Sequence, residues 1–463
     1  MTSGGATEQG RPPWYDNNGQ NRPVYIVGIA GGSASGKTCV AERIVKHLGV
    51  RWVVILSMDS FYRPLTPEQS KQAFANNYDF DRPDAFDYDA LFETLLKLKK
   101  GEAVDVPVYD FSKHARSTDQ VQAVYGATVV AFEGIFALYD AKVRELMDLC
   151  VFVDTDSDLR LARRLIRDCT QRGRDPEGVI QQYKRFVKPN HDQFIQPTMA
   201  HADIIIPRGL DNTIAIDVVT QHIRRQLAER HCDNRSILAS EQIAPGTPLP
   251  PNVVVLEQTP QLLAIHTKIR EASCSRDDFI FYADRLSRLV IERGLSELPY
   301  EDITVTTPVD VEYKGSRLAT TPSVVTVVRS GAPMEIAARQ VLADVPLGKV
   351  LIQSSPVTGE PRFHYKKLPR KISESPVLLL DATLGTGAAA MMAIRVLLDH
   401  GVGEDRIIFM CLLATQLGIH TIKRAFPKVK IVTSAVDAGL TSGTLMIEPG
   451  MGPFASRYFG TAD

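Results

Sequence analysis

The sequence predicts an α/β fold that occurs twice along one chain of 463 residues. Residues 24–231 alternate apolar, strand-like runs with helical stretches, the pattern of a parallel sheet covered by helices. Residues 253–463 mix β-branched runs with helical segments in the same way. Residues 232–252 between them are polar and rich in proline, which is typical of a linker. Residues 1–23 are rich in Gly, Pro and Asn, so we expect a disordered tail.

The individual strands are predicted from the apolar runs. In the first part they are expected at residues 24–30, 52–57, 129–132, 149–153 and 204–207. In the second part they are expected at residues 323–328, 349–352, 377–380, 407–412 and 430–433. The two parts therefore predict two separate sheets.

Charge and hydropathy exclude several functions. The 53 Lys and Arg nearly cancel the 54 Asp and Glu, so neither nucleic acid nor an anionic membrane is expected as a partner. No run of 18 uninterrupted apolar residues suggests a transmembrane helix. The scattered cysteines form no CxxC pair, which argues against zinc and disulfides. We expect a cytoplasmic protein, with the nucleus as the alternative.

The strongest motif follows the first predicted strand. Residues 31–38 read GGSASGKT, and a helical stretch comes directly after them, as a phosphate-binding loop requires. Lysine and the helix N-terminus would face the phosphates, and the threonine hydroxyl would bind Mg²⁺. The predicted ATP-binding residues are Gly31, Gly32, Ser33, Ala34, Ser35, Gly36, Lys37 and Thr38.

Further motifs favour a kinase over other phosphate-loop enzymes. No Asn-Lys-x-Asp guanine motif is present. Asp59 ends the second strand, where a carboxylate could take a proton from an attacking hydroxyl; a turn cap is the alternative. Glu133 ends the third strand, in the position of a second Mg²⁺-binding carboxylate.

Three segments could complete a binding site. Residues 78–87 and 108–116 combine carboxylates with aromatics, which suits sugar hydroxyls and a base, although turns with buried aromatics would look similar. Residues 158–174 carry six arginines, and helical spacing places Arg160, Arg164 and Arg167 on roughly one face. Such a helix could close over a triphosphate; a solvated basic face is the alternative.

Together these residues identify a family resemblance. The first part resembles uridine/cytidine kinases along essentially its whole length, through the strings GGSASGKT, LSMDSFYRPLT, FDRPDAFD, PVYDFSKHAR, FEGI, DLRLARRLIRDCTQRGRD, FVKPNHDQFIQPT and ADIIIPRG. The resemblance implies transfer of a phosphoryl group from ATP, with Mg²⁺, to the 5′-hydroxyl of uridine or cytidine in pyrimidine salvage.

The resemblance also assigns roles to residues. Asp59 would be the general base, and Lys37, Arg167 and Arg172 would contact phosphates. Thr38 and Glu133 would hold Mg²⁺. The implied nucleoside-binding residues are Tyr62, Phe80, Asp81, Tyr109, Phe111, His114, Arg164 and Arg174.

The second part contains another strand–loop–helix segment, which begins at Asp381 and could hold a sugar phosphate, or be an ordinary turn. Over about 200 residues this part resembles uracil phosphoribosyltransferase, through FYADRLSRLVIERGLSELPYE, TVTTPVDVEYKG, VVRSGAPMEIAAR, DATLGTG, IIFMCLLAT, FPKVKIVTSAVD and PGMGPFASRYFGT. That family transfers ribose 5-phosphate from PRPP to uracil. The implied, vestigial PRPP and uracil site comprises Arg329, Asp381, Thr386, Gly387 and Gly452.

The departures from that family fall in its site. Ser354 stands where the family has a PRPP-binding arginine, and Ala388 and Ala389 replace the Gly-Ser of its phosphate loop. Residues 452–457 lack both carboxylates of the family's Gly-Asp-x-Gly-Asp-Arg. Each loss removes a group that would balance a magnesium–pyrophosphate site, so we expect an intact fold with weak or absent transferase activity.

Two other interpretations stay open at this point. The chain could be bifunctional and also make UMP from uracil and PRPP. Alternatively, the second part could bind uracil, PRPP or an allosteric nucleotide without turnover. Because both families usually assemble, we expect a homo-oligomer.

Overall fold

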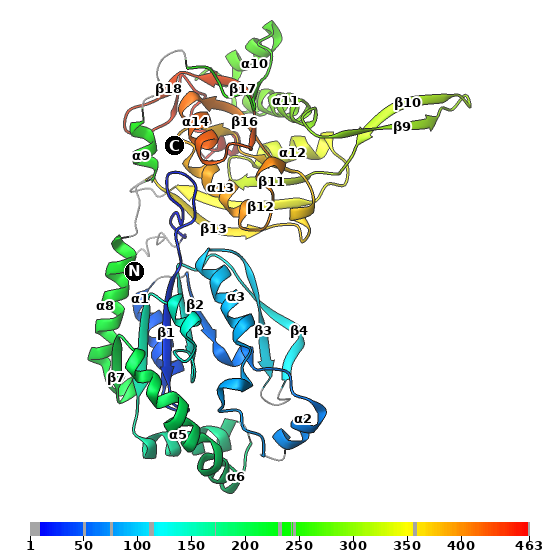
Figure 1. The fold of residues 1–463 in the computed structure, drawn as a ribbon. Helices are drawn as coiled ribbons and strands as arrows, with labels where there is room; N and C mark the ends of the chain where they lie inside the picture. Colours follow the sequence, from blue (N-terminus) through cyan, green and yellow to red (C-terminus); the bar gives the residue numbers. More distant parts are fainter. Residues whose placement is uncertain are drawn as a thin grey trace. The chain divides into compact units, whose positions relative to one another are not determined.

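The computed structural model describes residues 10–49, 52–74, 77–110, 115–171, 173–229, 234–241, 243, 247–354 and 359–461. They form two compact units (Figure 1). The N-terminal unit comprises Asn21–His231, and the C-terminal unit joins Cys232–Asp463 to Met1–Gln20.

The N-terminal unit contains a five-stranded parallel sheet in the order β2-β5-β1-β6-β7. All seven residues of the central strand β1 are buried, because helices cover both faces of the sheet. A separate antiparallel hairpin pairs β3 with β4. The strands are β1 (Tyr25–Gly31), β2 (Val53–Ser57), β3 (Val104–Asp110), β4 (Ala115–Val124), β5 (Val129–Gly134), β6 (Leu149–Asp154) and β7 (Ile204–Pro207).

The two faces of this sheet carry separate apolar cores. Side chains of β1 alternate between them: Val27 and Ile29 pack towards α1 and α8, whereas Ile26 and Ala30 belong to the core that includes α3. The helices are α1 (Lys37–Leu48), α2 (Pro67–Phe74), α3 (Tyr88–Lys99), α4 (Ala141–Glu145), α5 (Ser157–Gln171), α6 (Pro176–Gln182), α7 (Lys188–Asn190) and α8 (Thr213–Glu229).

The C-terminal unit is built on an eight-stranded sheet, in which seven strands follow the order β13-β12-β11-β14-β16-β17-β8 and β15 pairs with β16. Its strands run parallel except the edge strand β13. The strands are β8 (Val253–Val255), β11 (Ser323–Val328), β12 (Leu347–Ser354), β13 (Pro361–Lys367), β14 (Val377–Leu380), β15 (Thr383–Leu384), β16 (Ile407–Thr415) and β17 (Lys430–Asp437).

Helices α10–α12 pack on this sheet through one apolar core, and α13 and α14 contact β12, β13, β16 and β17. A long hairpin of β9 (Tyr300–Thr306) and β10 (Glu312–Leu318) extends away from its unit (Figure 1). The helices are α9 (Asn234–Ser240), α10 (Pro260–Arg270), α11 (Arg276–Leu295), α12 (Ala332–Val341), α13 (Ala388–Leu398), α14 (Gln416–Ala425) and α15 (Phe454–Phe459), and a short ladder pairs β18 (Gly439–Leu440) with β19 (Ile447–Glu448).

The predicted fold class is confirmed in both parts. The ten expected apolar runs all lie on sheet strands of the expected unit. Both hairpins and the edge strand β13 were missed, because polar residues interrupt their apolar ones and leave no continuous apolar run.

The expectation of disorder over residues 1–23 is wrong for residues 10–23. Arg11 exchanges two backbone hydrogen bonds with Phe363 of β13, at 2.6 and 2.8 Å. Trp14 is 6% exposed and donates a 3.0 Å hydrogen bond from Nε1 to Asp399. Tyr15 is 1% exposed. Two aromatic side chains therefore fix a segment whose overall composition is polar.

Part of the expected linker is also structured. Helix α9 contacts α13 and α14 of the C-terminal unit. An ion pair joins Arg424 of α14 to Glu241, at 2.7 Å. The segment that follows the N-terminal unit is therefore docked before the proline-rich stretch begins.

Candidate functional site

The phosphate loop joins β1 to α1 in the geometry that its glycines allow. Gly36 adopts φ 91°, a left-handed conformation, immediately before the first residue of α1, Lys37. At Gly31 a Cβ atom would lie 2.6 Å from the carbonyl oxygen of Val153. Thr155 donates a 3.0 Å hydrogen bond to the Ser35 carbonyl and so supports the loop from β6. The loop therefore presents the N-terminus of a long helix to an anion.

A pocket opens beside this loop and collects side chains from distant parts of the unit. It receives residues from the phosphate loop, the ends of β2 and β5, the hairpin strand β3, and helices α5 and α6. Its lining residues are Ser33, Lys37, Asp59, Tyr62, Phe80, Asp81, Tyr109, Ile135, Arg164, Arg167, Arg174 and Gln182.

Asp59 lies in the turn that follows β2. The cap of this turn is Ser57, whose Oγ accepts a 3.4 Å hydrogen bond from the backbone N–H of Asp59. The hydroxyl of Ser57 also donates to Glu133 at 2.9 Å, which ties the ends of β2 and β5 together. Because Ser57 supplies the cap, the Asp59 carboxylate can serve the pocket that it lines.

Asp81 is 8% exposed and faces the same pocket. Burial raises the pKa of Asp81, and the positive charges of Arg164 and Lys37 oppose that rise. The backbone N–H of Asp81 donates to Asp79 at 3.1 Å, and Asp79 in turn accepts two hydrogen bonds from Asn190. These hydrogen bonds fix the backbone at Asp81, and so the point from which its carboxyl group enters the pocket.

An aromatic wall forms another side of the pocket. Tyr62 stacks on Phe86 with ring centroids 4.2 Å apart, and its ring lies 5.1 Å from Tyr109 and 5.8 Å from Phe80. Phe86 is fully buried in the core, whereas Phe80 and Tyr109 are half-buried and line the pocket. Burial and the charge of Asp59 raise the pKa of Tyr109 to about 12. The aromatic clusters therefore serve both the core and the pocket.

Three arginines of α5 and the segment after it, Arg164, Arg167 and Arg174, are called the lid arginines here, and they converge on one buried carboxylate, Asp168. Its side chain is 0% exposed, and it lies 2.8 Å from Nε of Arg167 and 3.6 Å from nitrogens of Arg164 and Arg174. Gln182 accepts hydrogen bonds from Arg164 and Arg174, at 2.9 and 3.2 Å. Arg164 also donates to Ser33 at 2.8 Å. This network aims guanidinium groups at the phosphate loop.

Helices α5 and α6 differ from the prediction at one arginine, Arg160. They also contribute two polar residues that were not predicted, Asp168 and Gln182. Helical spacing placed Arg160 with the pocket arginines, but it does not line the pocket: it is 3% exposed and donates to the carbonyl of Thr155 at 2.9 Å. Asp168 and Gln182 were missed. Asp168 stands four residues after Arg164, a spacing that could have revealed it, whereas nothing local marks Gln182. Phe111, His114 and Arg172 lie outside the described residues.

Thr38 and Glu133 fit a divalent cation in the presence of phosphates. Thr38 is exposed on the first turn of α1. Glu133 is 4% exposed, and its buried Oε2 has no hydrogen-bond partner among the described residues. Among those residues no cluster of three or more His, Cys, Asp or Glu could hold a metal by itself. Since Mg²⁺ usually binds one or two protein oxygens plus phosphates and water, this donor set suits it.

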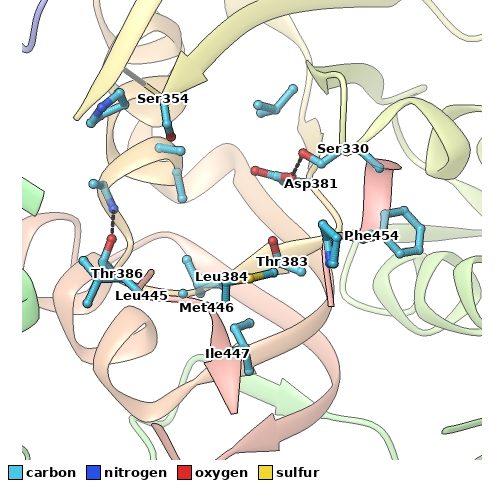
Figure 2. A pocket seen from close by; sticks show the side chains of 18 of the residues that line it. Ser330, Ser354, Asp381, Thr383, Leu384, Thr386, Leu445, Met446, Ile447 and Phe454 are labelled. Atoms are coloured by element: carbon cyan, nitrogen blue, oxygen red, sulfur yellow. Dashed lines mark hydrogen bonds between the residues drawn. The ribbon is translucent and has the colours of Figure 1, made fainter. Parts of the chain in front are cut away.

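The C-terminal unit has a larger cavity, of about 340 Å³, beside the loop from β14 to α13 (Figure 2). Asp381 is 5% exposed and accepts a hydrogen bond from Ser330, which faces it in Figure 2. Burial raises the pKa of Asp381 to about 7. Thr386 accepts a 3.4 Å hydrogen bond from the backbone N–H of Ala388.

The residues expected in this second site lie together with one exception. Asp381, Thr386, Gly387 and Gly452 line the cavity. Arg329 does not line it, and instead donates to the hydroxyl of Ser456, at 3.1 Å. The positions that depart from the transferase pattern surround the same cavity; they are Ser354, Ala388, Ala389, Pro453 and Ser456.

No helix among the described residues is long and apolar enough to cross a membrane.

Comparison with known proteins agrees with this geometry. Residues 26–215 match the Phosphoribulokinase / Uridine kinase family, and residues 255–461 match the Uracil phosphoribosyltransferase family. The chain is 52% identical to Uridine-cytidine kinase-like 1 of Mus musculus, over 98% of this chain and 82% of that protein. It is 45% identical to Uridine-cytidine kinase A of Dictyostelium discoideum, over 98% of this chain and 89% of that one. It is 44% identical to Uridine kinase of Schizosaccharomyces pombe, over 92% of this chain and 93% of that one.

With identities of 44% to 52% over 82% to 93% of the length of these relatives, and with both halves matched in order, the chain belongs to the uridine-cytidine kinase family of enzymes.

Proposed function

We propose that this protein transfers the terminal phosphoryl group of ATP to the 5′-hydroxyl of uridine and cytidine, giving UMP and CMP. One observation carries the proposal: the phosphate loop, the carboxylates of Asp59 and Asp81, an aromatic wall and the lid arginines line a single pocket. The printed names of the relatives support the same pair of nucleosides.

The positions of the lining residues suggest a separate role for each part of the nucleoside. The 5′-hydroxyl would lie against Asp59, which accepts its proton as the hydroxyl attacks the terminal phosphorus. Asp81 and Arg164 would hold the ribose hydroxyls, and the pyrimidine would lie against Phe80 and Tyr109. In phosphoryl transfer, positioning and charge stabilisation provide most of the catalysis.

Charge on the phosphates would be balanced from two sides. Lys37 approaches them from the loop, and Arg167 approaches from α5. Mg²⁺, held by Thr38 and Glu133, would neutralise charge on the phosphate oxygens when bound. Asp168, which is itself fully buried, pairs with all three lid arginines and so holds them in one orientation.

The test uses the full-length protein with ATP, Mg²⁺ and either nucleoside. We expect UMP from uridine and CMP from cytidine. 5′-Deoxyuridine lacks the accepting hydroxyl and should bind without turnover. 2′-Deoxyuridine should show a raised KM, because Asp81 loses a hydroxyl partner. Absence of phosphorylation of both nucleosides would refute the proposal.

We further propose that the C-terminal unit does not make UMP from uracil and PRPP. The support is that replaced positions surround its cavity, including Ser354, Pro453 and Ser456. Incubation of the protein with uracil, PRPP and Mg²⁺, without ATP, should yield no UMP. Clear UMP formation would show instead a bifunctional enzyme. A cytoplasmic location, with the nucleus as the alternative, and a homo-oligomeric state stay predictions.

A further inference from the structure

Phe80 and Asp81 enter the kinase pocket from a short segment that begins with a third residue, Asp79. Both Phe80 and Asp81 line the pocket, whereas Asp79 does not. Oδ1 of Asp79 instead accepts a hydrogen bond from the backbone N–H of Asp81 at 3.1 Å, which closes a turn over the segment. The position of this one carboxylate therefore determines where an aromatic ring and a second carboxylate enter the pocket.

Asn190 holds the Asp79 carboxylate from a distant part of the chain. Its Nδ2 donates to both carboxylate oxygens, at 2.9 and 2.7 Å. Asn190 is 8% exposed and does not itself line the pocket. A hydrogen bond to an ionised acceptor is stronger than one between neutral groups, and an amide nitrogen has two hydrogens to donate. The Asn190 side chain is therefore used in orienting Asp79 and not in contacting a ligand.

The helical segment that carries Asn190 also contacts the phosphate loop. Asn190 ends α7, which lies between two π-helical turns, Tyr183–Val187 and His191–Ile195. The next residue, His191, is 6% exposed. A Cβ atom at Gly32 would lie 2.9 Å from Cδ2 of His191, so the imidazole packs directly against the phosphate loop. Two consecutive residues of one helical segment therefore contact the phosphate side and the nucleoside side of the site.

Such a link is useful because phosphoryl transfer depends on positioning. The attacking hydroxyl must lie in line with the terminal phosphorus, and a misplacement of about 1 Å can cost roughly 10²-fold in rate. The phosphate loop would hold one reactant, and the segment with Phe80 and Asp81 would hold the other. The contact of Asn190 with Asp79 fixes the second segment against a helix that is packed on the first.

We propose that Asn190 is a positioning residue for the nucleoside: through Asp79 it sets where Asp81 meets the sugar, and so it strengthens the preference for ribose over 2′-deoxyribose. The inference rests on the proposed function, because that function places the ribose hydroxyls against Asp81. It requires no contact between Asn190 and either substrate. Loss of Asn190 should therefore weaken nucleoside binding, and most of all the part of it that depends on the 2′-hydroxyl.

The experiment is calorimetric titration of the full-length protein with uridine and with 2′-deoxyuridine, in the absence of ATP. Asn190→Ala should bind uridine about tenfold more weakly than wild type, because a charge-assisted hydrogen bond is lost, and its loss for 2′-deoxyuridine should be smaller. Its affinity for ATP, titrated separately, should stay within about twofold of wild type. Gln193→Ala is the matched control: it removes an exposed amide from the same helical segment, outside the pocket, and should bind both nucleosides as wild type does.

An exchange of donor and acceptor tests whether Asn190 acts through Asp79. Asn190→Asp sets two carboxylates against each other and should weaken uridine binding more than Asn190→Ala does. When Asp79→Asn is added, the amide at position 79 can donate to the carboxylate at position 190. The double variant should therefore return to within about threefold of the wild-type affinity for uridine. Melting temperatures of all variants show whether they are folded.

Three results would overturn the proposal: an unchanged uridine affinity in Asn190→Ala, an equal loss for uridine, 2′-deoxyuridine and ATP, or a double variant that binds no better than Asn190→Asp. Absence of uridine binding by the wild type would also overturn it. The proposed function is tested separately, by UMP formation when ATP and Mg²⁺ are added to the wild type. Either statement can therefore fail while the other holds.

Discussion

At the scale of single residues, acidic side chains in this protein differ mainly in what surrounds them. Asp59 lines the kinase pocket at the end of β2, Asp168 is enclosed by arginines, and Asp381 is buried against Ser330. The first is placed to accept a proton, the second to orient cations, and the third to be partly neutral. The same functional group therefore predicts three different mutant phenotypes.

Asp59→Asn should reduce kcat for uridine by about 10²–10⁴-fold, because the amide cannot accept the proton of the attacking hydroxyl. ATP binding should remain close to wild type. Asp84→Asn is the control: Asp84 belongs to the same acidic segment but pairs with Arg82 at 3.1 Å and does not line the pocket. Steady-state kinetics and ATP titration measure both effects, and a normal kcat for Asp59→Asn would exclude the general-base role.

Asp168→Asn should lower kcat/KM for uridine by at least about tenfold, because three arginines lose the charge that orients them. Asp158→Asn, at the exposed start of α5, should be near neutral. The ratio of kcat/KM values is measured at a temperature where melting curves show both variants folded. Unchanged kinetics for Asp168→Asn would mean that the lid arginines orient themselves without it.

Asp381 predicts a pH dependence of stability. Its pKa is about 7 in the folded protein and near 3.8 when unfolded, so the unfolded state releases this proton first as pH rises. Its contribution to stability is therefore lost progressively between pH 4 and 7. In a Trp52→Phe background, Trp14 reports on the C-terminal unit, since the chain has two tryptophans. The urea midpoint from Trp14 fluorescence should fall from pH 5 to pH 8. In the Asp381→Asn variant the midpoint should fall less over the same range. An equal pH dependence of the two midpoints would contradict a raised pKa at Asp381.

At the scale of elements, the N-terminal segment of residues 10–20 acts as a part of the C-terminal unit. It pairs with the edge strand β13 through Arg11 and packs Trp14 against Phe363, with ring centroids 5.7 Å apart. Arg395 of α13 donates to the carbonyl of Gly19 at 3.2 Å. The segment therefore covers a sheet edge that would otherwise be open to pairing.

Trp14→Ala should lower the free energy of unfolding of the C-terminal unit by about 3–5 kcal/mol, because a large buried side chain and its hydrogen bond to Asp399 are lost. The exposed Asn18→Ala is the control within the same segment and should change it by less than about 0.5 kcal/mol. Differential scanning calorimetry is the measurement, and kinase activity should change little in either variant. A Trp14→Ala protein as stable as wild type would show that the docking contributes nothing.

At the scale of the whole molecule, the sequence predicted what depends on local pattern. The buried strands, the phosphate loop and strand-end carboxylates such as Asp59 and Glu133 follow from apolar runs and fixed spacings. Trp14 was missed because a polar composition conceals a few anchoring aromatics. Gln182 and Asn190 were missed because each acts through contacts with residues distant in the sequence, which leave no periodic signal.

The docking of residues 10–20 has a further consequence for the connectivity of the chain. Because the chain leaves the C-terminal unit after Gln20 and returns to it at Cys232, the kinase unit is an insertion in the other unit, with both of its ends tethered. A protease cut in the proline-rich stretch 243–251 would leave the two pieces joined through non-covalent contacts of residues 10–20 and α9 with residues after the cut. Such nicked protein should elute as one species in gel filtration and separate only in denaturant, as a fragment-complementation pair.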